Sequence, residues 1–260
     1  MRVRSINAVM AVVIAALVFK VLSVDKSYSS TDVTIAEVQE IATSSEPAVS
    51  ANNEVLVDVM EDIAEPVNET IDFSLEECEI YFAGLCDINQ DVVAWIRFKD
   101  GKIDLPILDE SQKELDYYLH HDIYGEESSA GTLFVENTDR VKNRIIYGHN
   151  MKNGSMFGSL KYLVWDENAL QNPEFTIWTV DGVEHLFEII SIAITEENSS
   201  LYQMPESDEE YDSYVNLLLS AGTYSNVDAE GLSTRNDLVT LSTCYGMGSN
   251  ERLIVVAVEM

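Results

Sequence analysis

The sequence is short of basic residues and of cysteine, and each shortage excludes a class of protein. Its 260 residues carry 15 Lys and Arg against 46 Asp and Glu, a formal net charge of -31. Because contacts to phosphate need Lys and Arg, this charge excludes nucleic acid as a partner. The three cysteines cannot all pair within the chain, and so low a count does not indicate a disulfide framework. No glycine-rich phosphate loop joins an expected strand to an expected helix, so nucleotide binding has no support.

What the chain does have is apolar residues, which make up 46% of it, enough for the core of one ordinary domain with appendages. Residues 1–25 place Arg2 and Arg4 before an apolar run from Ile6 to Phe19, followed by Lys20 and four more largely apolar residues. A helix from Ile6 to Val24 reaches about 28 Å, which crosses the hydrocarbon layer if Lys20 extends to the far headgroups.

A single-pass, uncleaved membrane anchor is favoured over a cleaved secretory signal for residues 1–25. No A-x-A-like arrangement of small residues follows the apolar run, and such a site is needed for cleavage. Basic residues flank the cytoplasmic end of membrane anchors, so the N-terminus is expected in the cytoplasm and the rest of the chain outside the cell.

Residues 26–73 are rich in Asp, Glu, Ser, Thr and Asn, with no glycine and with no aromatic residue between Tyr28 and Phe73. Such a segment buries too little apolar surface to offset the entropy lost on ordering, so the sequence predicts an extended, acidic, extracellular stalk. The simplest interpretation of the charge is that it keeps a tether soluble. The alternatives are that it binds cations or repels anionic polymers.

Folded structure is expected from residue 74 to residue 260. Ser74 and Glu77 form a capping box ahead of apolar residues at helical spacing. Cys78 and Cys86 lie in this expected helix, about 12 Å apart along its axis, which is beyond the reach of a disulfide, so they are interpreted as packing residues.

The rest of this region reads as many short strands with two or three helices in the connections, which predicts a mostly β fold, a closed or nearly closed β-barrel with helical excursions. The expected strands are Val92–Phe98, Ile103–Leu108, Gly131–Val135, Arg144–His149, Phe175–Val180 and Val183–Ile194, the last two joined at Asp181-Gly182. The expected helices are a short one marked by Met156, Leu160, Leu163 and Val164, and one capped by Ser207 and Glu210 that buries Tyr211, Tyr214, Val215 and Leu218.

The C-terminal segment predicts two antiparallel strands, Leu238–Thr243 and Leu253–Val258, around a Gly, Ser and Asn loop. Cys244 ends the first strand, and closure of the hairpin brings Arg252 beside it. A lone cysteine in a strand is more often a small packing residue than a nucleophile. A thiol next to a permanent cation, however, is typical of a low-pKa nucleophile.

A histidine supplies the remaining chemistry. His149 ends the expected strand Arg144–His149, before the turn-forming pair Asn153-Gly154. Acyl transfer at a peptide bond needs a nucleophile, a proton donor for the leaving amine and a positive group for the oxyanion. Cys244, His149 and Arg252 have these chemistries, and we expect them to act as nucleophile, general acid and base, and oxyanion stabiliser.

Four segments together resemble the sortase family, class B, over roughly residues 75–260. They are DVVAWIRFKDGKIDLPIL at 91–108, YYLHHDIYGEESSAGTLFVE at 117–136, IIYGHNMKNGSMFG at 145–158, and TLSTC at 240–244 with its following Arg252 and RLIVV strand. The resemblance implies an eight-stranded sortase barrel with N-terminal helices and a helix before the cysteine strand.

The same resemblance implies a cysteine transpeptidase that works without a cofactor. Such an enzyme cuts a C-terminal cell-wall sorting signal of an exported protein and joins the new carboxyl end to an amine of peptidoglycan or of a pilin. It also implies that Ser242 and Leu119 lie near the sorting peptide. Class B members often have an acidic residue directly after the cysteine, where this chain has Tyr245.

Two alternative functions stay open, whereas a metal site is not expected. His120 and His121, with Asp122, Glu126 and Glu127 nearby, suggest a metal site, but adjacent side chains on a strand point to opposite faces, so no metal is expected there or at His185. A secreted cysteine peptidase would resolve its thioester with water instead of an amine. A non-catalytic surface adhesin would explain the acidic stalk but not the three residues His149, Cys244 and Arg252.

Overall fold

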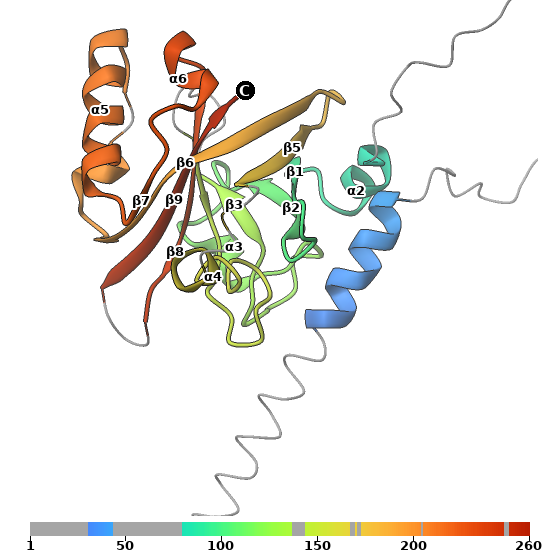
Figure 1. Ribbon diagram of the computed structural model, residues 1–260. Helices are drawn as coiled ribbons and strands as arrows, with labels where there is room; N and C mark the ends of the chain where they lie inside the picture. Colours follow the sequence, from blue (N-terminus) through green and yellow to red (C-terminus); the bar gives the residue numbers. More distant parts are fainter. Residues whose placement is uncertain are drawn as a thin grey trace, which may run out of the picture.

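The strands of the protein close into a barrel. The structure, a computed structural model, describes residues 31–43, 80–136, 144–166, 170, 173–203, 205–246 and 250–260. Within these ranges, eight strands pair in the order β5-β1-β2-β3-β4-β8-β9-β6 and β5 pairs back onto β6, while β7 pairs with a later stretch of β6, on the edge opposite β9 (Figure 1). The prediction of a closed eight-stranded barrel with helical excursions is confirmed.

The strands match the expected positions to within a few residues, apart from the two-residue β7, which the sequence did not predict. They are β1 (Val92–Phe98), β2 (Asp104–Asp109), β3 (Leu133–Val135), β4 (Arg144–Tyr147), β5 (Glu174–Thr179), β6 (Glu184–Glu196), β7 (Tyr224–Ser225), β8 (Leu238–Cys244) and β9 (Glu251–Glu259). β5 and β6 form the expected hairpin at Asp181-Gly182, and β8 pairs antiparallel with β9 over its whole length.

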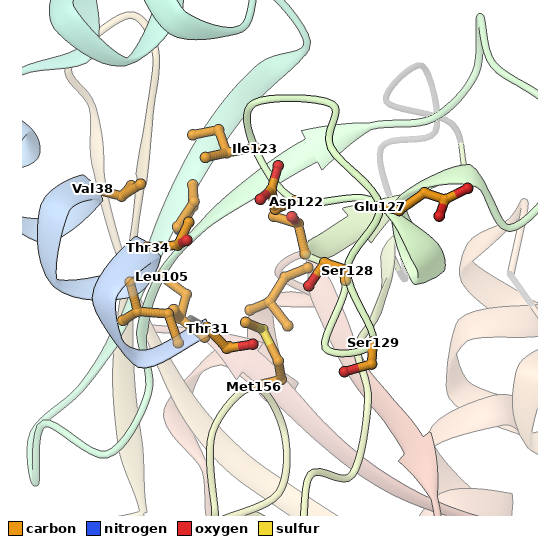
Figure 2. Close-up of a pocket in the computed structure, with 15 residues that line it drawn as sticks. Thr31, Thr34, Val38, Leu105, Asp122, Ile123, Glu127, Ser128, Ser129 and Met156 are labelled. Atoms are coloured by element: carbon orange, nitrogen blue, oxygen red, sulfur yellow. The ribbon is translucent and has the colours of Figure 1, made fainter. Parts of the chain in front are cut away.

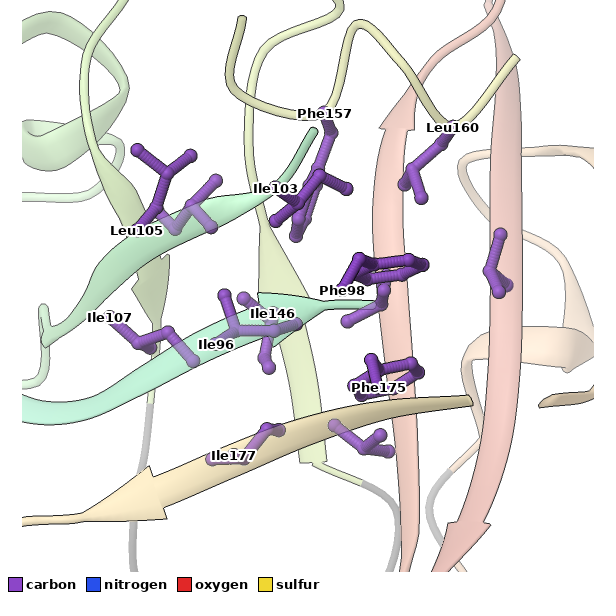
Figure 3. Packing of buried hydrophobic residues seen from close by; sticks show 14 of the residues in the cluster. Ile96, Phe98, Ile103, Leu105, Ile107, Ile146, Phe157, Leu160, Phe175 and Ile177 are labelled. Carbon is purple, nitrogen blue, oxygen red and sulfur yellow. The ribbon is translucent and has the colours of Figure 1, made fainter. Parts of the chain in front are cut away.

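The barrel interior is filled by apolar side chains that alternate with outward-facing ones along each strand. Phe175 lies at its centre, stacked on Phe98 with ring centroids 4.8 Å apart and on Phe187 at 5.6 Å. Isoleucines from β1, β2, β4 and β5 surround this aromatic stack, and two residues of the segment after β4, Phe157 and Leu160, close one end of it (Figure 3).

Helices cover two parts of the outer surface and leave β4 between them. α2 (Phe82–Ile88) and α3 (Tyr117–His120) pack on outward residues of β1 to β3, such as Trp95 and Phe134. A short 3-10 helix, η2 (Ser200–Tyr202), and α5 (Asp208–Ala221) pack on β6, β8 and β9. Further helices are α4 (Tyr162–Trp165), α6 (Glu230–Thr234) and one at residues 31–43.

α5 begins as its sequence predicts. The Ser207 side chain accepts a hydrogen bond from the backbone N–H of Glu210 at 3.3 Å, and the Glu210 carboxylate accepts one from the N–H of Glu206 at 2.7 Å. Two otherwise unpaired N–H groups are therefore satisfied at the helix start. The four residues expected to be buried are Tyr211, Tyr214, Val215 and Leu218, and all four are.

A helix at residues 31–43 corrects the prediction that residues 26–73 are wholly an extended stalk. Val38 and Ala42 of this helix are buried, and Gln39 donates a hydrogen bond from Nε2 to the carbonyl of Asp104 in β2 at 2.8 Å. Ile35, Val38 and Ala42 are spaced as one face of a helix, which gains apolar contacts on the barrel although the surrounding composition is polar. Composition averaged over the whole segment conceals this stripe.

Several sequence expectations fall outside the described residues. These are the membrane anchor at residues 1–25, the capping box of Ser74 and Glu77, and Cys78. Cys86 lies in α2, half-buried, and burial raises the pKa of its thiol, with the Asp87 carboxylate adding to the effect. No helix in the described ranges has the length and the apolar character needed to cross a membrane.

Candidate active site

Cys244 and Arg252 face each other across the β8–β9 hairpin. They are direct register partners, and the next pair along is joined by a bond from the N–H of Tyr245 to the carbonyl of Glu251 at 2.9 Å. In an antiparallel ladder the hydrogen-bonded pairs alternate with pairs whose side chains lie closer, so Cys244 and Arg252 form a close pair. Cys244 is exposed at the strand end. The expectation that the hairpin brings Arg252 back beside Cys244 is therefore met.

The guanidinium of Arg252 is anchored by two contacts near the thiol. Its Nη2 donates to the carboxylate of Glu197 at 3.1 Å, and its Nη1 donates to the carbonyl of Glu251 at 3.4 Å. The Arg252 side chain is 22% exposed and that of Glu197 is 73% exposed. Solvent screening makes so exposed an ion pair weak, so the guanidinium is oriented but not locked.

His149 reaches the same place through the parallel pairing of β4 with β8. Arg144 pairs with Val239 and Tyr147 with Ser242, a constant offset of 95 residues (239 minus 144). The same offset, carried two residues further, matches position 149 with position 244. Since side chains alternate, His149 shares the outward face of Tyr147, and Cys244 shares the outward face of Leu238, which packs under α5. Both side chains therefore belong to the outer surface at one end of the barrel.

The imidazole of His149 is fixed by a backbone carbonyl that precedes it by thirty residues. Its Nε2 lies 2.9 Å from the carbonyl oxygen of Leu119 in α3. A carbonyl only accepts, so this contact requires a proton on Nε2 and leaves Nδ1 as the nitrogen that exchanges one. Burial lowers the pKa of His149; the Leu119 carbonyl opposes that effect, and the nearby His120 imidazole, with ring centroids 6.3 Å apart, adds to it.

The chain around His149 is held by close packing. A Cβ atom on Gly148 would lie 2.4 Å from Leu133 and 2.9 Å from Phe157, so only glycine fits before the histidine. Phe157 is fully buried in the barrel interior, and its N–H donates to the carbonyl of His149 at 3.0 Å. Phe157 thus anchors the loop after His149 to the end of the barrel.

Ser242 and Leu119, the two expected substrate contacts, both make contacts within the protein. Ser242 is 3% exposed, and its hydroxyl is 2.8 Å from that of Tyr202 in η2. Burial raises the pKa of Tyr202, and the Arg252 guanidinium acts in the opposite direction. The Leu119 side chain packs at the edge of the outer cluster under α3, while its carbonyl serves His149.

Tyr245, which takes the position of the acid common in class B, joins the cysteine strand to α4. Its hydroxyl accepts a hydrogen bond from Trp165 Nε1 at 3.3 Å.

Sequence reasoning missed the functional neighbours Tyr202, Glu197 and Asn150, because each comes into the site from a loop or short helix that carries no periodic signal of its own. Asn150 donates from Nδ2 to the carbonyl of Cys244 at 2.8 Å.

Two cavities of the described residues lie apart from these groups. One, of about 270 Å³, separates the helix at residues 31–43 from the loop 122–132; Thr31, Thr34, Ser128 and Ser129 contribute hydroxyls, and Leu105 and Met156 contribute apolar walls (Figure 2). The other, of about 490 Å³, opens at the opposite end of the barrel near Arg144, His185 and Glu259. Neither is lined by Cys244, His149 or Arg252.

Two of the histidines that were weighed as metal ligands, His121 and His185, contact other groups of the protein. His121 stacks on Tyr117 with ring centroids 3.9 Å apart, and its Nδ1 contacts the carbonyl of Tyr117 at 2.8 Å. His185 Nδ1 lies 2.6 Å from the carboxylate of Glu259. Over the described part of the chain, no three His, Cys, Asp or Glu side chains converge in a way that suits a metal ion.

Comparison with known proteins gives consistent matches. The Sortase domain family model matches residues 101–260. Sortase B of Listeria monocytogenes is 35% identical over 166 residues, which cover 60% of this chain and 64% of that protein, a little under two thirds of its length. The crystal structure of sortase B from Bacillus anthracis in complex with AAEK1 superposes with a TM-score of 0.68 at 28% identity, covering 90% of this chain and 98% of that one. The X-ray structure of Clostridium perfringens sortase B superposes with a TM-score of 0.62 at 29% identity, covering 69% of this chain and 100% of that one.

Proposed function

Because this chain belongs to the sortase family, class B, we propose that it is a cysteine transpeptidase acting on a sorting signal of exported proteins. The observation that carries the proposal is the strand register: Cys244 faces Arg252 across the β8–β9 ladder, and His149 and Cys244 each lie two residues beyond the last pair of the β4–β8 ladder, Tyr147 and Ser242. Thiol, guanidinium and imidazole are the three groups that acyl transfer at a peptide bond needs.

In the first half-reaction, the Cys244 thiolate attacks the carbonyl carbon of the scissile peptide bond. The electron pair of the carbonyl moves to its oxygen, and Arg252 donates hydrogen bonds to the resulting oxyanion. The C–N bond then breaks, and the imidazolium of His149 gives a proton to the leaving amine. The products are a thioester on Cys244 and a free amine on the released C-terminal peptide.

In the second half-reaction, an acceptor amine attacks the thioester carbon and His149 takes up the proton that this amine loses. The C–S bond breaks, Cys244 leaves as thiolate, and a new amide bond joins the substrate to the acceptor. Nδ1 is the atom of His149 that carries this proton, because Nε2 is engaged with the carbonyl of Leu119.

Burial of His149 has a consequence for the working state of the enzyme. The lowered pKa of the imidazole reduces the imidazolium fraction at neutral pH, so the proton-donating form of His149 is its minority form. Arg252 suits the third role because its charge does not depend on pH in the working range. Its contacts with Glu197 and Glu251 use two of the five N–H groups of the guanidinium fork.

Ser242 and Leu119 are proposed to shape the groove for the sorting peptide. Support for Ser242 comes from its bond to Tyr202, which orders a tyrosine beside the thiol. Support for Leu119 comes from its position in α3, where it is half-buried next to the carbonyl contact with His149.

The proposed setting is the outer face of a cell membrane. Residues 1–25 would cross the membrane once, with Arg2 and Arg4 in the cytoplasm. Residues 26–30 would lead from this span to the helix at residues 31–43, which rests on the barrel, and the catalytic domain would be extracellular. The acceptor amine would belong to a peptidoglycan precursor or to a pilin.

The test is product analysis with the full-length chain in detergent, a library of sorting-signal peptides and an added amine. We expect a cleaved peptide whose new carboxyl end is joined to the amine, and a loss of at least ~10³-fold in Cys244→Ala. Products that carry only water, with amine present in excess, would identify a peptidase instead. A Cys244 thiol that reacts with an alkylating agent no faster than a free cysteine, with no cleavage, would support the adhesin.

A further inference from the structure

The backbone hydrogen bonds between the β4 and β8 segments end just before His149 and Cys244. The last backbone bond between the two segments runs from the N–H of Gly148 to the carbonyl of Ser242, at 3.2 Å. In a parallel ladder each strand donates from every second residue. After Gly148, the next donor on the β4 side would therefore be the backbone N–H of residue 150, and its acceptor on the β8 side would be the carbonyl of Cys244.

The side chain of Asn150 takes that position in place of the backbone. Its Nδ2 donates to the carbonyl of Cys244 at 2.8 Å. The Asn150 backbone instead forms an isolated antiparallel bridge with Met156, which turns the chain away from β8 and into the loop that Phe157 plugs into the barrel. One residue therefore both leaves the sheet and keeps the two strand ends joined.

We propose that Asn150 is a positioning residue that fixes the distance between the His149 imidazole and the Cys244 thiol. The imidazole is already held on one side by the carbonyl of Leu119. Asn150 supplies the second restraint by tying the backbone next to His149 to the backbone of the nucleophile itself. This inference rests on the proposed transpeptidase function.

The restraint requires a donor, which explains why an amide suits this position. The acceptor is a carbonyl oxygen, so an aspartate of the same size would face it with a second acceptor, and an alanine would leave it without this partner. Reacting groups that shift by about 1 Å lose up to ~100-fold in rate, so the removal of the restraint affects catalysis before it affects binding.

The experiment compares Asn150→Ala with Asn153→Ala in the full-length chain. Asn153 lies in the same loop, and its Nδ2 contacts Asp32 of the helix at residues 31–43 at 3.2 Å instead of β8. For Asn150→Ala we expect kcat to fall by about 10- to 100-fold with KM changed less than about twofold, and for Asn153→Ala we expect both to stay within about twofold. Asn150→Gln, which keeps an amide donor, should recover part of the lost kcat.

A second readout keeps this inference separate from the proposed function. The alkylation rate of Cys244, measured against pH, reports the coupling of thiol and imidazole whether or not any peptide is turned over. We expect Asn150→Ala to change this pH profile in the parent chain and to leave it unchanged in a His149→Ala background. If Asn150→Ala lowers the melting temperature, the uncharged Asn150→Leu, of similar size and without a donor, replaces it, with Asn153→Leu as its control.

The inference is overturned if the Asn150 variant matches its Asn153 control in both kcat and alkylation profile. It is also overturned if the alkylation change persists without His149, since Asn150 would then act on the cysteine directly. If the Asn150 variant has the same alkylation profile as the parent chain, and the parent chain transpeptidates no peptide, both the positioning role and the proposed function are contradicted.

Discussion

The two halves of the proposed site are built in different ways. The Cys244 and Arg252 side is one hairpin, whose register alone makes the two residues partners, eight positions apart in the chain (252 minus 244). The His149 side is assembled from distant segments, since its imidazole depends on Leu119, its loop on Phe157 and its backbone on Asn150 and Cys244. Local strand pairing therefore positions the nucleophile and the cation, whereas contacts between distant segments position the proton donor.

This difference predicts that the hairpin side fails only when a reacting group is removed. Arg252→Ala should lower kcat/KM by about 10²- to 10³-fold, because the oxyanion loses its charged donor while the β8–β9 ladder stays intact. The check is steady-state kinetics together with a melting temperature close to that of the parent. Glu197→Ala is the control, since it removes the exposed partner of Arg252 and should cost far less. Equal losses in the two variants would show that Arg252 matters only through its ion pair.

The histidine side should fail when packing is lost at a distance from the chemistry. Phe157→Ala opens a cavity at the end of the barrel and should lower the free energy of unfolding by about 3–5 kcal/mol, as measured by denaturant titration. Under conditions where the variant is folded, kcat should also fall, because the loop that carries His149 loses its plug.

Phe175→Ala is the matched control for this prediction. Phe175 is equally buried in the same interior cluster but lies on β5, away from the His149 loop. It should show a similar loss of stability and a normal kcat in the folded fraction. Equal kcat values for the two variants would contradict the idea that packing around Phe157 positions the histidine.

A smaller effect is expected from His120, which adds to the lowering of the pKa of His149. His120→Gln removes a like charge that disfavours the imidazolium, so the pKa of His149 should rise and its limb of the pH–rate profile should move to higher pH. His121→Gln is the control, because that ring stacks on Tyr117. A profile that moves equally in both variants, or in neither, would exclude His120 as the cause.

The same contrast explains what the sequence can predict. Alternating β-branched residues with Gly and Asn between them indicate the β8–β9 hairpin and hence the pairing of Cys244 with Arg252, because hairpin register is a local property. The β4 strand is also predictable, but its parallel pairing with β8 joins segments 95 residues apart (239 minus 144), and no local rule specifies it.

The parts that sequence reasoning missed are long-range contacts between ordinary residues. A backbone carbonyl at Leu119 and an amide at Asn150 have no signature, since any residue supplies the first and most loops contain the second. The helix at residues 31–43 escapes prediction for a related reason, because its buried stripe of Ile35, Val38 and Ala42 lies in a segment whose average composition is acidic and polar.

The central claim is that Cys244 carries the acyl group between the sorting peptide and the amine. The direct measurement is mass spectrometry of the protein after reaction with a sorting-signal peptide in the absence of amine. The claim predicts an added acyl mass on the peptide fragment that contains Cys244, and its release as ligated product when amine is supplied. An acyl group on any other residue, or ligation by Cys244→Ala at the parent rate, would contradict it.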